Sequence, residues 1–187
     1  MNILFVCTGN TCRSPMAAAV LKARMPDVHV QSAGIFAYNG QPAATQAVTV
    51  LAEAGIPLEH KSQSISPEIL EWADLVLTMT TSHKQALIID HPDYQDKYFT
   101  LKEYASESDK EIWKELRELY AELEAERHQL PEAQLREKAG RVQELERHLI
   151  DYDIQDPFGG SVEQYKETLR ELEQYIQLLA DTLKRKP

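Results

Sequence analysis

The sequence predicts an α/β protein in which helices flank a four-stranded parallel sheet, with a helical hairpin inserted late in the chain. Two patterns lead to this prediction. Short apolar runs alternate with helical segments up to residue 105, an order that is typical of βαβ units with parallel strands. Beyond residue 105, charged sequence with apolar residues at helical spacing replaces the strand-like runs, which predicts paired helices.

The expected elements follow from these runs and from the residues that cap or stop helices. Strands are expected at residues 2–6, 29–33, 73–79 and 97–101. Helices are expected at residues 14–24, 42–54, 66–71, 81–89 and 161–183. Ser14 and Ser161 are typical N-terminal caps, whereas Gly55 and Pro57 are typical of a helix end. The last helix carries apolar residues on one face, which is expected to pack against the sheet.

Residues 106–150 are expected to form the hairpin. Its apolar positions are Ile112, Leu116, Leu119, Leu123, Leu135, Val142, Leu145 and Leu149. Pro131 divides them into two helices, because proline interrupts helical hydrogen bonding. The hairpin is either a solvated insertion or a docking arm, whose apolar seam a protein partner or a second copy of the chain completes. Residues 1–187 are expected to form one domain that contains this insertion.

Composition narrows the expected partners and location. The net charge is −10, so nucleic acid and anionic membranes are poor partners, whereas a basic protein segment is favoured. The two cysteines are close in sequence, and no Cys and His residues have zinc-ligand spacing, so neither a disulfide framework nor a metal or other cofactor is expected. The sequence shows no signal peptide and no long apolar run, so a soluble cytoplasmic protein is expected.

The segment from Cys7 to Ser14 joins the first strand to the first helix and is expected to bind an anion. Such a loop directs successive backbone N–H groups inward, and the helix dipole adds a favourable potential. Gly9 and Asn10 tolerate the positive φ that this conformation needs. A thiol at Cys7 and a guanidinium at Arg13 would then face the same tetrahedral anion, as nucleophile and clamp.

The surroundings of Cys7 favour a nucleophile over a core residue, although a cysteine late in a strand is commonly core. The helix N-terminus and Arg13 are expected to lower the pKa of the thiol, and the Ser14 hydroxyl is available to hydrogen-bond the thiolate. A Walker-type nucleotide loop is disfavoured, because Gly9 is the single glycine of the segment and no lysine follows.

Two motifs then point to a family. Residues 6–17, VCTGNTCRSPMA, resemble the signature loop of the low-molecular-weight protein tyrosine phosphatases, and Asp156-Pro157 resembles the segment that supplies their general acid. The resemblance implies the Rossmann-like three-layer fold of that family and hydrolysis through a cysteinyl-phosphate. It makes Cys7 the nucleophile, Arg13 the phosphate clamp and Asp156 the general acid, with no metal or cofactor.

The resemblance also bears on specificity. Thr11 and the run DPFGG at residues 156–160 are most similar to the branch of the family that hydrolyses phosphoarginine in proteins. Members directed to tyrosine usually have an aliphatic residue in place of Thr11 and a second aromatic residue after Phe158, where this chain has Gly159. The resemblance therefore implies a protein-arginine phosphatase acting on phosphorylated proteins, with a protein tyrosine phosphatase as the alternative.

Two other classes of function are disfavoured. Thiol-dependent arsenate reductases share the scaffold and the loop but need a resolving cysteine pair further along, and no cysteine follows Cys12. A non-catalytic phosphoprotein-binding module would not need Asp156, which is present together with Cys7 and Arg13.

Further site residues follow from position and from the resemblance. The substrate site is expected to be lined by Thr8, Gly9, Asn10, Thr11, Cys12, Ser14, Tyr38 and Phe158. Tyr38 belongs to this set because it follows the second strand, at the sheet edge where ligands bind. The resemblance places Ser32 and His60 in a hydrogen-bond network that supports Asn10 and Ser14.

Separate expectations concern Cys12 in the loop and Thr80 after the third predicted strand. Cys12 is expected to form a reversible disulfide with Cys7, which would protect the nucleophile from over-oxidation. Thr80 stands where many relatives have an aspartate that holds the loop arginine. Its hydroxyl is expected to accept a hydrogen bond from Arg13 in place of that aspartate.

Overall fold

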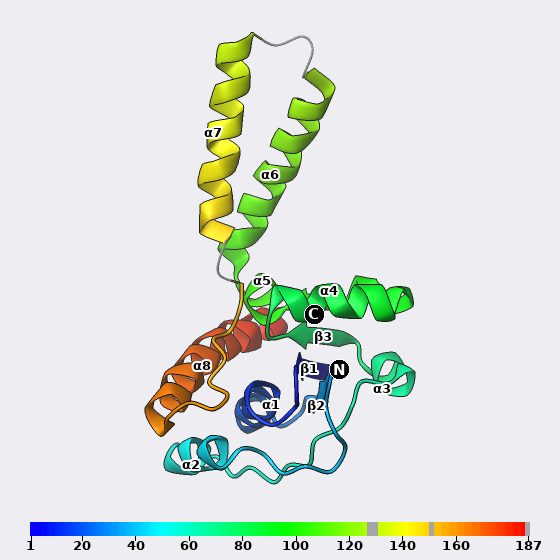
Figure 1. Cartoon of the computed structure of the whole chain (residues 1–187), viewed down its shortest axis with the longest axis vertical. Helices are drawn as coiled ribbons and strands as arrows, with labels where there is room; N and C mark the ends of the chain where they lie inside the picture. Colours follow the sequence, from blue (N-terminus) through cyan, green and yellow to red (C-terminus); the bar gives the residue numbers. More distant parts are fainter. Residues whose placement is uncertain (127–130, 150–151, 186–187) are drawn as a thin grey trace. The chain divides into compact units, whose positions relative to one another are not determined.

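A computed structural model describes residues 1–126, 131–149 and 152–185 (Figure 1). The chain consists of two compact units. One unit consists of Met1–Ala105 and Asp153–Pro187, and the other is Ser106–Tyr152. The second unit contains the segment for which the sequence predicts a hairpin. The loop from Cys7 to Ser14 and the Asp156-Pro157 motif both belong to the first unit.

The first unit is built on a four-stranded parallel sheet, as the sequence predicts. Its strands are β1 Asn2–Cys7, β2 His29–Gly34, β3 Leu75–Thr78 and β4 Tyr98–Thr100, in the spatial order β2-β1-β3-β4. Cys7 lies opposite Gly34, and Val6 lies opposite Thr78. The carboxyl ends of these strands therefore lie together at one edge of the sheet, where ligands of open α/β sheets bind.

Helices cover both faces of the sheet, because successive residues of β1 point to opposite faces. Ile3 and Phe5 face the larger core, whereas Leu4 and Val6 face the smaller one. The helices of the larger core are α1 Arg13–Arg24, α2 Thr45–Glu53, α5 Leu101–Ala105 and α8 Val162–Arg185. The helices of the smaller core are α3 Pro67–Trp72 and α4 Thr81–Asp90.

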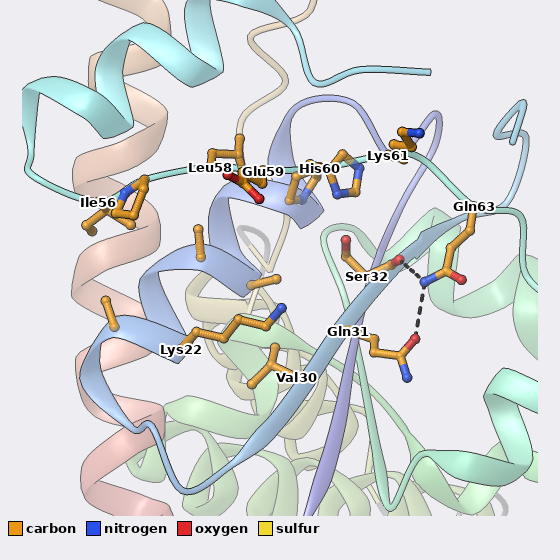
Figure 2. A pocket seen from close by; sticks show the side chains of 15 residues that line it. Lys22, Val30, Gln31, Ser32, Ile56, Leu58, Glu59, His60, Lys61 and Gln63 are labelled. Atoms are coloured by element: carbon orange, nitrogen blue, oxygen red, sulfur yellow. Dashed lines mark hydrogen bonds between the residues drawn. The ribbon is translucent and has the colours of Figure 1, made fainter. Parts of the chain in front are cut away.

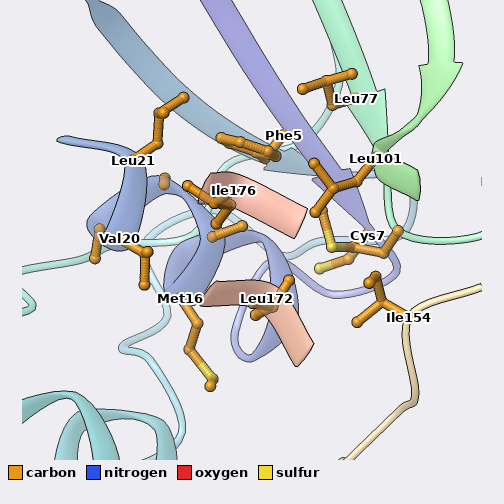
Figure 3. Close-up of a cluster of buried hydrophobic side chains, with 14 of the residues drawn as sticks. Phe5, Cys7, Met16, Val20, Leu21, Leu77, Leu101, Ile154, Leu172 and Ile176 are labelled. Atoms are coloured by element: carbon orange, nitrogen blue, oxygen red, sulfur yellow. The ribbon is translucent and has the colours of Figure 1, made fainter. Parts of the chain in front are cut away.

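The larger core joins β1 to α1 and α8. Figure 3 shows side chains of all three elements in this core, among them Phe5, Leu21 and Ile176. These three residues are fully buried, and burial of each side chain contributes about 1.5–3 kcal/mol. The buried face of α8 includes the apolar residues that the sequence predicts to meet the sheet. Among the described residues, no helix is long and apolar enough to cross a membrane.

The structure differs from the sequence prediction at several element ends and in two unpredicted short helices. α1 begins at Arg13 with Cys12 at its N-cap, so Ser14 lies within the helix and is not its cap as predicted. α2 begins at Thr45 and not at residue 42, because Pro42 forms an isolated antiparallel bridge with Lys61. A 3-10 helix, Pro92–Lys97, and α5 directly after β4 were not predicted. Both are too short to show a helical period in the sequence.

The second unit contains two helices, α6 Glu107–Glu126 and α7 Glu132–Leu149. α7 begins directly after Pro131, as predicted, whereas Leu130 lies outside the described residues. Leu116, Val142 and Leu145 are buried between the helices. Ile112, Leu119, Leu123 and Tyr152 pack around them. The side chain of Leu149 lies outside the described part of the chain.

Ion pairs accompany this seam. Arg141 pairs with Glu115 at 2.7 Å, and Lys138 pairs with Glu122 at 2.8 Å, each joining α7 to α6. The two helices therefore cover part of their own apolar seam. The expectation that a partner helix or a second copy completes this seam stays a prediction, because Ile112, Leu119 and Leu123 remain only partly buried between the two helices.

Candidate active site

The loop between β1 and α1 brings a thiol and a guanidinium to the same cavity. Cys7 is the last residue of β1, and Arg13 is the first residue of α1. A cavity of about 190 Å³ lies over them. It is lined by Cys7, Thr8, Gly9, Thr11, Cys12, Arg13, Asp156 and Phe158. Cys7, Arg13 and Asp156 are the predicted nucleophile, clamp and general acid. The other five lining residues are ones that the sequence predicts to line the substrate site.

Asn10 holds the loop in shape from below the cavity. Its φ is 55°, and it is the single non-glycine residue with positive φ in the described chain. Its side-chain amide donates to Ser14 Oγ and to Ser32 Oγ, both at 2.9 Å, and its Oδ1 accepts the N–H of Gln63 at 2.9 Å. His60 Nε2 donates to the Asn10 carbonyl at 2.7 Å. The predicted network is present, and Gln63 is a member that the sequence did not indicate.

Gly34 permits the loop to lie close to β2. A Cβ atom at this position would lie 2.6 Å from the carbonyl oxygen of Thr8 and 2.8 Å from the amide nitrogen of Asn10. Both are backbone atoms, so they cannot rotate away as a flexible side chain would. Glycine is therefore the residue that fits beneath the loop.

The Cys7 thiol is buried at the base of the cavity, and its surroundings have opposing effects on its pKa. Its Sγ lies 2.9 Å from Ser14 Oγ. Burial raises the pKa of the Cys7 thiol above its ordinary value, whereas the Ser14 hydrogen bond and the charge of Arg13 lower it in part. The prediction of a net lowering is not confirmed, because the desolvation that accompanies burial is the largest of these effects.

Arg13 is held by the segment that precedes α8, and not by Thr80 as expected. Its Nη2 donates to Asp156 Oδ2 at 2.7 Å, and its Nη1 donates to the carbonyl of Ile154 at 3.3 Å. The side chain of Arg13 is 5% exposed and that of Asp156 is 50% exposed, so the arginine side of the pair is shielded from solvent and the aspartate side is not. Thr80 instead caps α4 by accepting the N–H of His83 at 3.1 Å. Its hydroxyl is therefore engaged away from Arg13.

The segment that carries Asp156 is fixed at several points. Asp153 Oδ1 accepts the N–H and the hydroxyl of Thr81 at 2.7 and 3.0 Å. The N–H of Ile154 donates to the carbonyl of Met79 at 2.8 Å. Asp156 is thereby placed at the cavity, while Asp153 serves as an anchor at the start of α4.

The aromatic residues around the cavity are arranged differently from the prediction. Phe158 lines the cavity with its ring 77% exposed. Tyr38 is also 77% exposed but does not line it. The loop of Tyr38 is tied to another segment, because Ser62 Oγ donates to the Tyr38 carbonyl and Ser64 Oγ donates to the Ala37 carbonyl. The prediction that Tyr38 walls the substrate site is therefore not supported by the structure.

Both cysteines are free thiols that line the same cavity. Cys12 Sγ lies 3.0 Å from the hydroxyl of Tyr165, a residue of α8. Burial and this hydrogen bond raise the pKa of Tyr165. The sequence predicts Tyr165 only as part of the apolar face of α8, because a partner this distant in sequence leaves no local signal.

His83 is a second residue that sequence reasoning missed. Its Nε2 lies 2.9 Å from Thr8 Oγ1, and its Nδ1 lies 2.9 Å from Thr80 Oγ1. The side chain is 9% exposed. Burial and the nearby charge of Arg13 lower the pKa of His83 to about 4, so the ring is neutral at pH 7. A histidine on a helix carries no sequence signal of such a role.

A larger hollow of about 490 Å³ lies between α1, β2 and the segment after α2 (Figure 2). Lys22, Val30, Gln31 and His60 are among its lining residues. Neither Cys7 nor Arg13 lines it, so the smaller cavity is the candidate active site. In residues 1–126, 131–149 and 152–185, no group of three or more His, Cys, Asp or Glu residues is placed to hold a metal ion.

Comparison with known proteins agrees with this geometry. Residues 2–141 match the family described as Low molecular weight phosphotyrosine protein phosphatase. A protein-arginine-phosphatase from Geobacillus stearothermophilus is 38% identical over 182 residues, which cover 97% of this chain and 95% of that protein. The low molecular weight protein-tyrosine-phosphatase PtpB of Staphylococcus haemolyticus is 31% identical over 172 residues and 92% of each chain.

A solved structure extends the comparison to three dimensions. A YwlE arginine phosphatase mutant with a phosphorylated active site serine has a TM-score of 0.73 and 37% identity, covering 100% of this chain and 97% of that chain. The family match includes the loop that holds Cys7 and Arg13. The chain therefore belongs to the low molecular weight phosphotyrosine protein phosphatase family.

Proposed function

We propose that the protein removes phosphate from phosphoarginine residues of other proteins. This proposal rests on the observation that Cys7, Arg13, Asp156 and Thr11 line the same cavity. The first three supply a nucleophile, a clamp and an acid, and Thr11 gives the wall a polar group. Relatives named protein-arginine-phosphatase, similar over nearly the whole chain, support the choice of substrate.

The reaction begins when Cys7, after its thiol proton has passed to water, attacks phosphorus as a thiolate in line with the leaving nitrogen. The Ser14 hydrogen bond and the charge of Arg13 favour this thiolate. The S–P bond forms, the P–N bond breaks, and Asp156 gives its proton to the departing guanidine. Backbone N–H groups of the loop and Arg13 stabilise the charge on the equatorial oxygens. The phosphorylated serine in the solved YwlE mutant is consistent with a covalent intermediate of this kind.

Hydrolysis of the cysteinyl-phosphate completes the cycle. Asp156, now ionised, takes a proton from water as that water attacks phosphorus and releases Cys7. The 2.7 Å pair between Arg13 and Asp156 keeps both groups at the cavity before substrate binds. A phosphoryl group would then compete for Arg13 and release the carboxyl group for proton transfer.

The remaining assignments concern location and organisation. We place the protein in the cytoplasm, where thiols such as Cys7 remain reduced. The unit of Met1–Ala105 and Asp153–Pro187 is the catalytic part of a single phosphatase domain, and residues 106–150 are an insertion in it. The net charge of −10 favours substrate segments that are rich in basic residues.

Side-by-side kinetics on a phosphoarginine peptide and a phosphotyrosine peptide test the function. We expect the wild type to prefer phosphoarginine, and Thr11→Ile to reduce that preference by roughly tenfold or more, because an aliphatic wall offers no partner to a guanidine. Cys7→Ser should abolish turnover of both peptides. A wild type that prefers phosphotyrosine would leave the thiolate mechanism in place and refute the substrate assignment.

Ser14 provides a test of how the nucleophile is activated. The hydrogen bond from Ser14 lowers the pKa of Cys7 against the effect of burial. We therefore expect Ser14→Ala to raise the pKa of the Cys7 thiol and to move its alkylation by iodoacetamide to higher pH. Cys12→Ser isolates the Cys7 signal in this experiment. An alkylation profile that stays in place or moves to lower pH would contradict this role of Ser14.

We also propose that Cys12 protects Cys7 from oxidation. Peroxide would oxidise the two thiols to a disulfide with release of water, and a dithiol would reduce the bond again. We expect peroxide to inactivate the wild type reversibly and Cys12→Ser irreversibly, because Cys7 alone is oxidised beyond the sulfenic acid. The measurement is activity before and after dithiothreitol. Equal recovery of the two proteins would exclude the protective role.

We propose that the hairpin binds a protein partner or a second copy of the chain through its apolar seam. Ile112, Leu119 and Leu123 are only partly buried between α6 and α7 and leave apolar surface for such a contact. Light scattering on the intact chain tests whether that partner is a second copy. We expect a dimer that persists as salt is raised, because salt screens charge pairs but does not weaken apolar contacts. A monomer at low salt would exclude self-association.

A further inference from the structure

The contact between His83 and Thr8 joins α4 to the wall of the candidate active site. Thr8 lines the cavity and is exposed to it, whereas His83 is buried behind the loop. Both ring nitrogens of His83 lie 2.9 Å from a threonine hydroxyl, Nε2 from Thr8 and Nδ1 from Thr80. The Thr8 side chain could otherwise adopt any of three rotamers. The hydrogen bond with His83 therefore fixes the position of the Thr8 hydroxyl.

The partners of Thr80 determine the direction of these bonds. Thr80 Oγ1 already accepts the backbone N–H of His83 as the cap of α4. Its hydroxyl hydrogen is then best used as a donor to Nδ1, which makes Nε2 the protonated nitrogen of the neutral ring. Nε2–H in turn donates to Thr8. The oxygen of Thr8 keeps one lone pair, and its hydrogen remains available on the cavity side.

We propose that Thr8 is a specificity-determining residue for the phosphorylated guanidine and that His83 is its positioning residue. This inference rests on the proposed function. In a phosphoguanidine, an N–H donor and phosphoryl oxygens stand on neighbouring atoms. A hydroxyl with one free lone pair and one free hydrogen satisfies both, accepting from the N–H and donating to a phosphoryl oxygen.

An aryl phosphate would form fewer hydrogen bonds with the Thr8 hydroxyl. Its bridging oxygen and ring carry no N–H, so the free lone pair of Thr8 loses water without gaining a donor. The contact therefore favours the phosphoramidate over the ester. It acts beside Thr11, which lines the same cavity and whose hydroxyl lies 3.6 Å from Cys12 Sγ, so Thr11 can be varied separately from the pair of Thr8 and His83.

Two substitutions of His83 separate its contacts. Asparagine places an amide near the position of Nδ1 and so keeps the bond to Thr80. Glutamine places an amide near the position of Nε2 and so keeps the bond to Thr8. Thr8→Val removes the hydroxyl with almost no change in shape. His91→Asn, the same substitution at the C-terminal cap of α4, is the matched control.

The measured quantity is the ratio of kcat/KM for a phosphoarginine peptide to kcat/KM for a phosphotyrosine peptide. We expect Thr8→Val and His83→Asn each to lower this ratio by about three- to tenfold, the effect of one hydrogen bond. His83→Gln and His91→Asn should keep the wild-type ratio. In the double variant, His83→Asn should lower the ratio no further than Thr8→Val alone, because His83 acts through Thr8.

A purely structural role of His83 predicts a different pattern. It would change both activities together, leave the ratio in place and add to the effect of Thr8→Val, and any of these results overturns the inference. If His83→Asn fails to fold, Thr8→Val still tests the hydroxyl, and ¹⁵N spectra of the histidine rings in the wild type test the positioning. An Nδ1–H tautomer of His83 would overturn it.

These outcomes can be told apart from failure of the proposed function. A wild type with no activity on phosphoarginine refutes the proposed function and this inference with it. A wild type active on both peptides, whose ratio is insensitive to Thr8→Val, refutes this inference alone.

Discussion

The positive φ of Asn10 is the constraint on which the candidate site depends. An asparagine in this conformation costs backbone energy, and the structure offsets that cost by satisfying its side chain from Ser14, Ser32 and Gln63. The same bonds fix where Ser14 points, and Ser14 in turn lies 2.9 Å from Cys7. A loop without this anchor would have neither an ordered set of N–H groups nor a defined neighbour for the thiol.

A second set of contacts brings Asp156 to the loop. Asp153 and Ile154 are bound to residues at the carboxyl end of β3, and Asp156 is bound to Arg13, 143 positions away in the sequence. These contacts all lie within the first unit. The position of Asp156 is therefore set by contacts of residues after 152, within the first unit.

The sequence predicted what is local and contiguous. The order of strands and helices, the loop from Cys7 to Arg13 and the role of Ser161 as a cap depend on neighbouring residues, and the structure contains all of them. Tyr38, Thr80 and the pKa of Cys7 were predicted wrongly, because each depends on packing. Ser62 and Ser64 turn the Tyr38 loop aside, a helix cap occupies the Thr80 hydroxyl, and burial outweighs the polar contacts of Cys7.

The charges around the cavity are matched to a substrate that is itself partly cationic. Arg13 is the buried cation, and Asp156 balances it. His83 lies behind the same wall, and its pKa of about 4 keeps it neutral at pH 7. A second cation at this position would repel a guanidinium, whereas a neutral ring that orients Thr8 leaves the wall polar and uncharged. Burial of His83 thus has two consequences, since it removes a charge that would oppose the substrate and keeps the ring able to donate and accept at once.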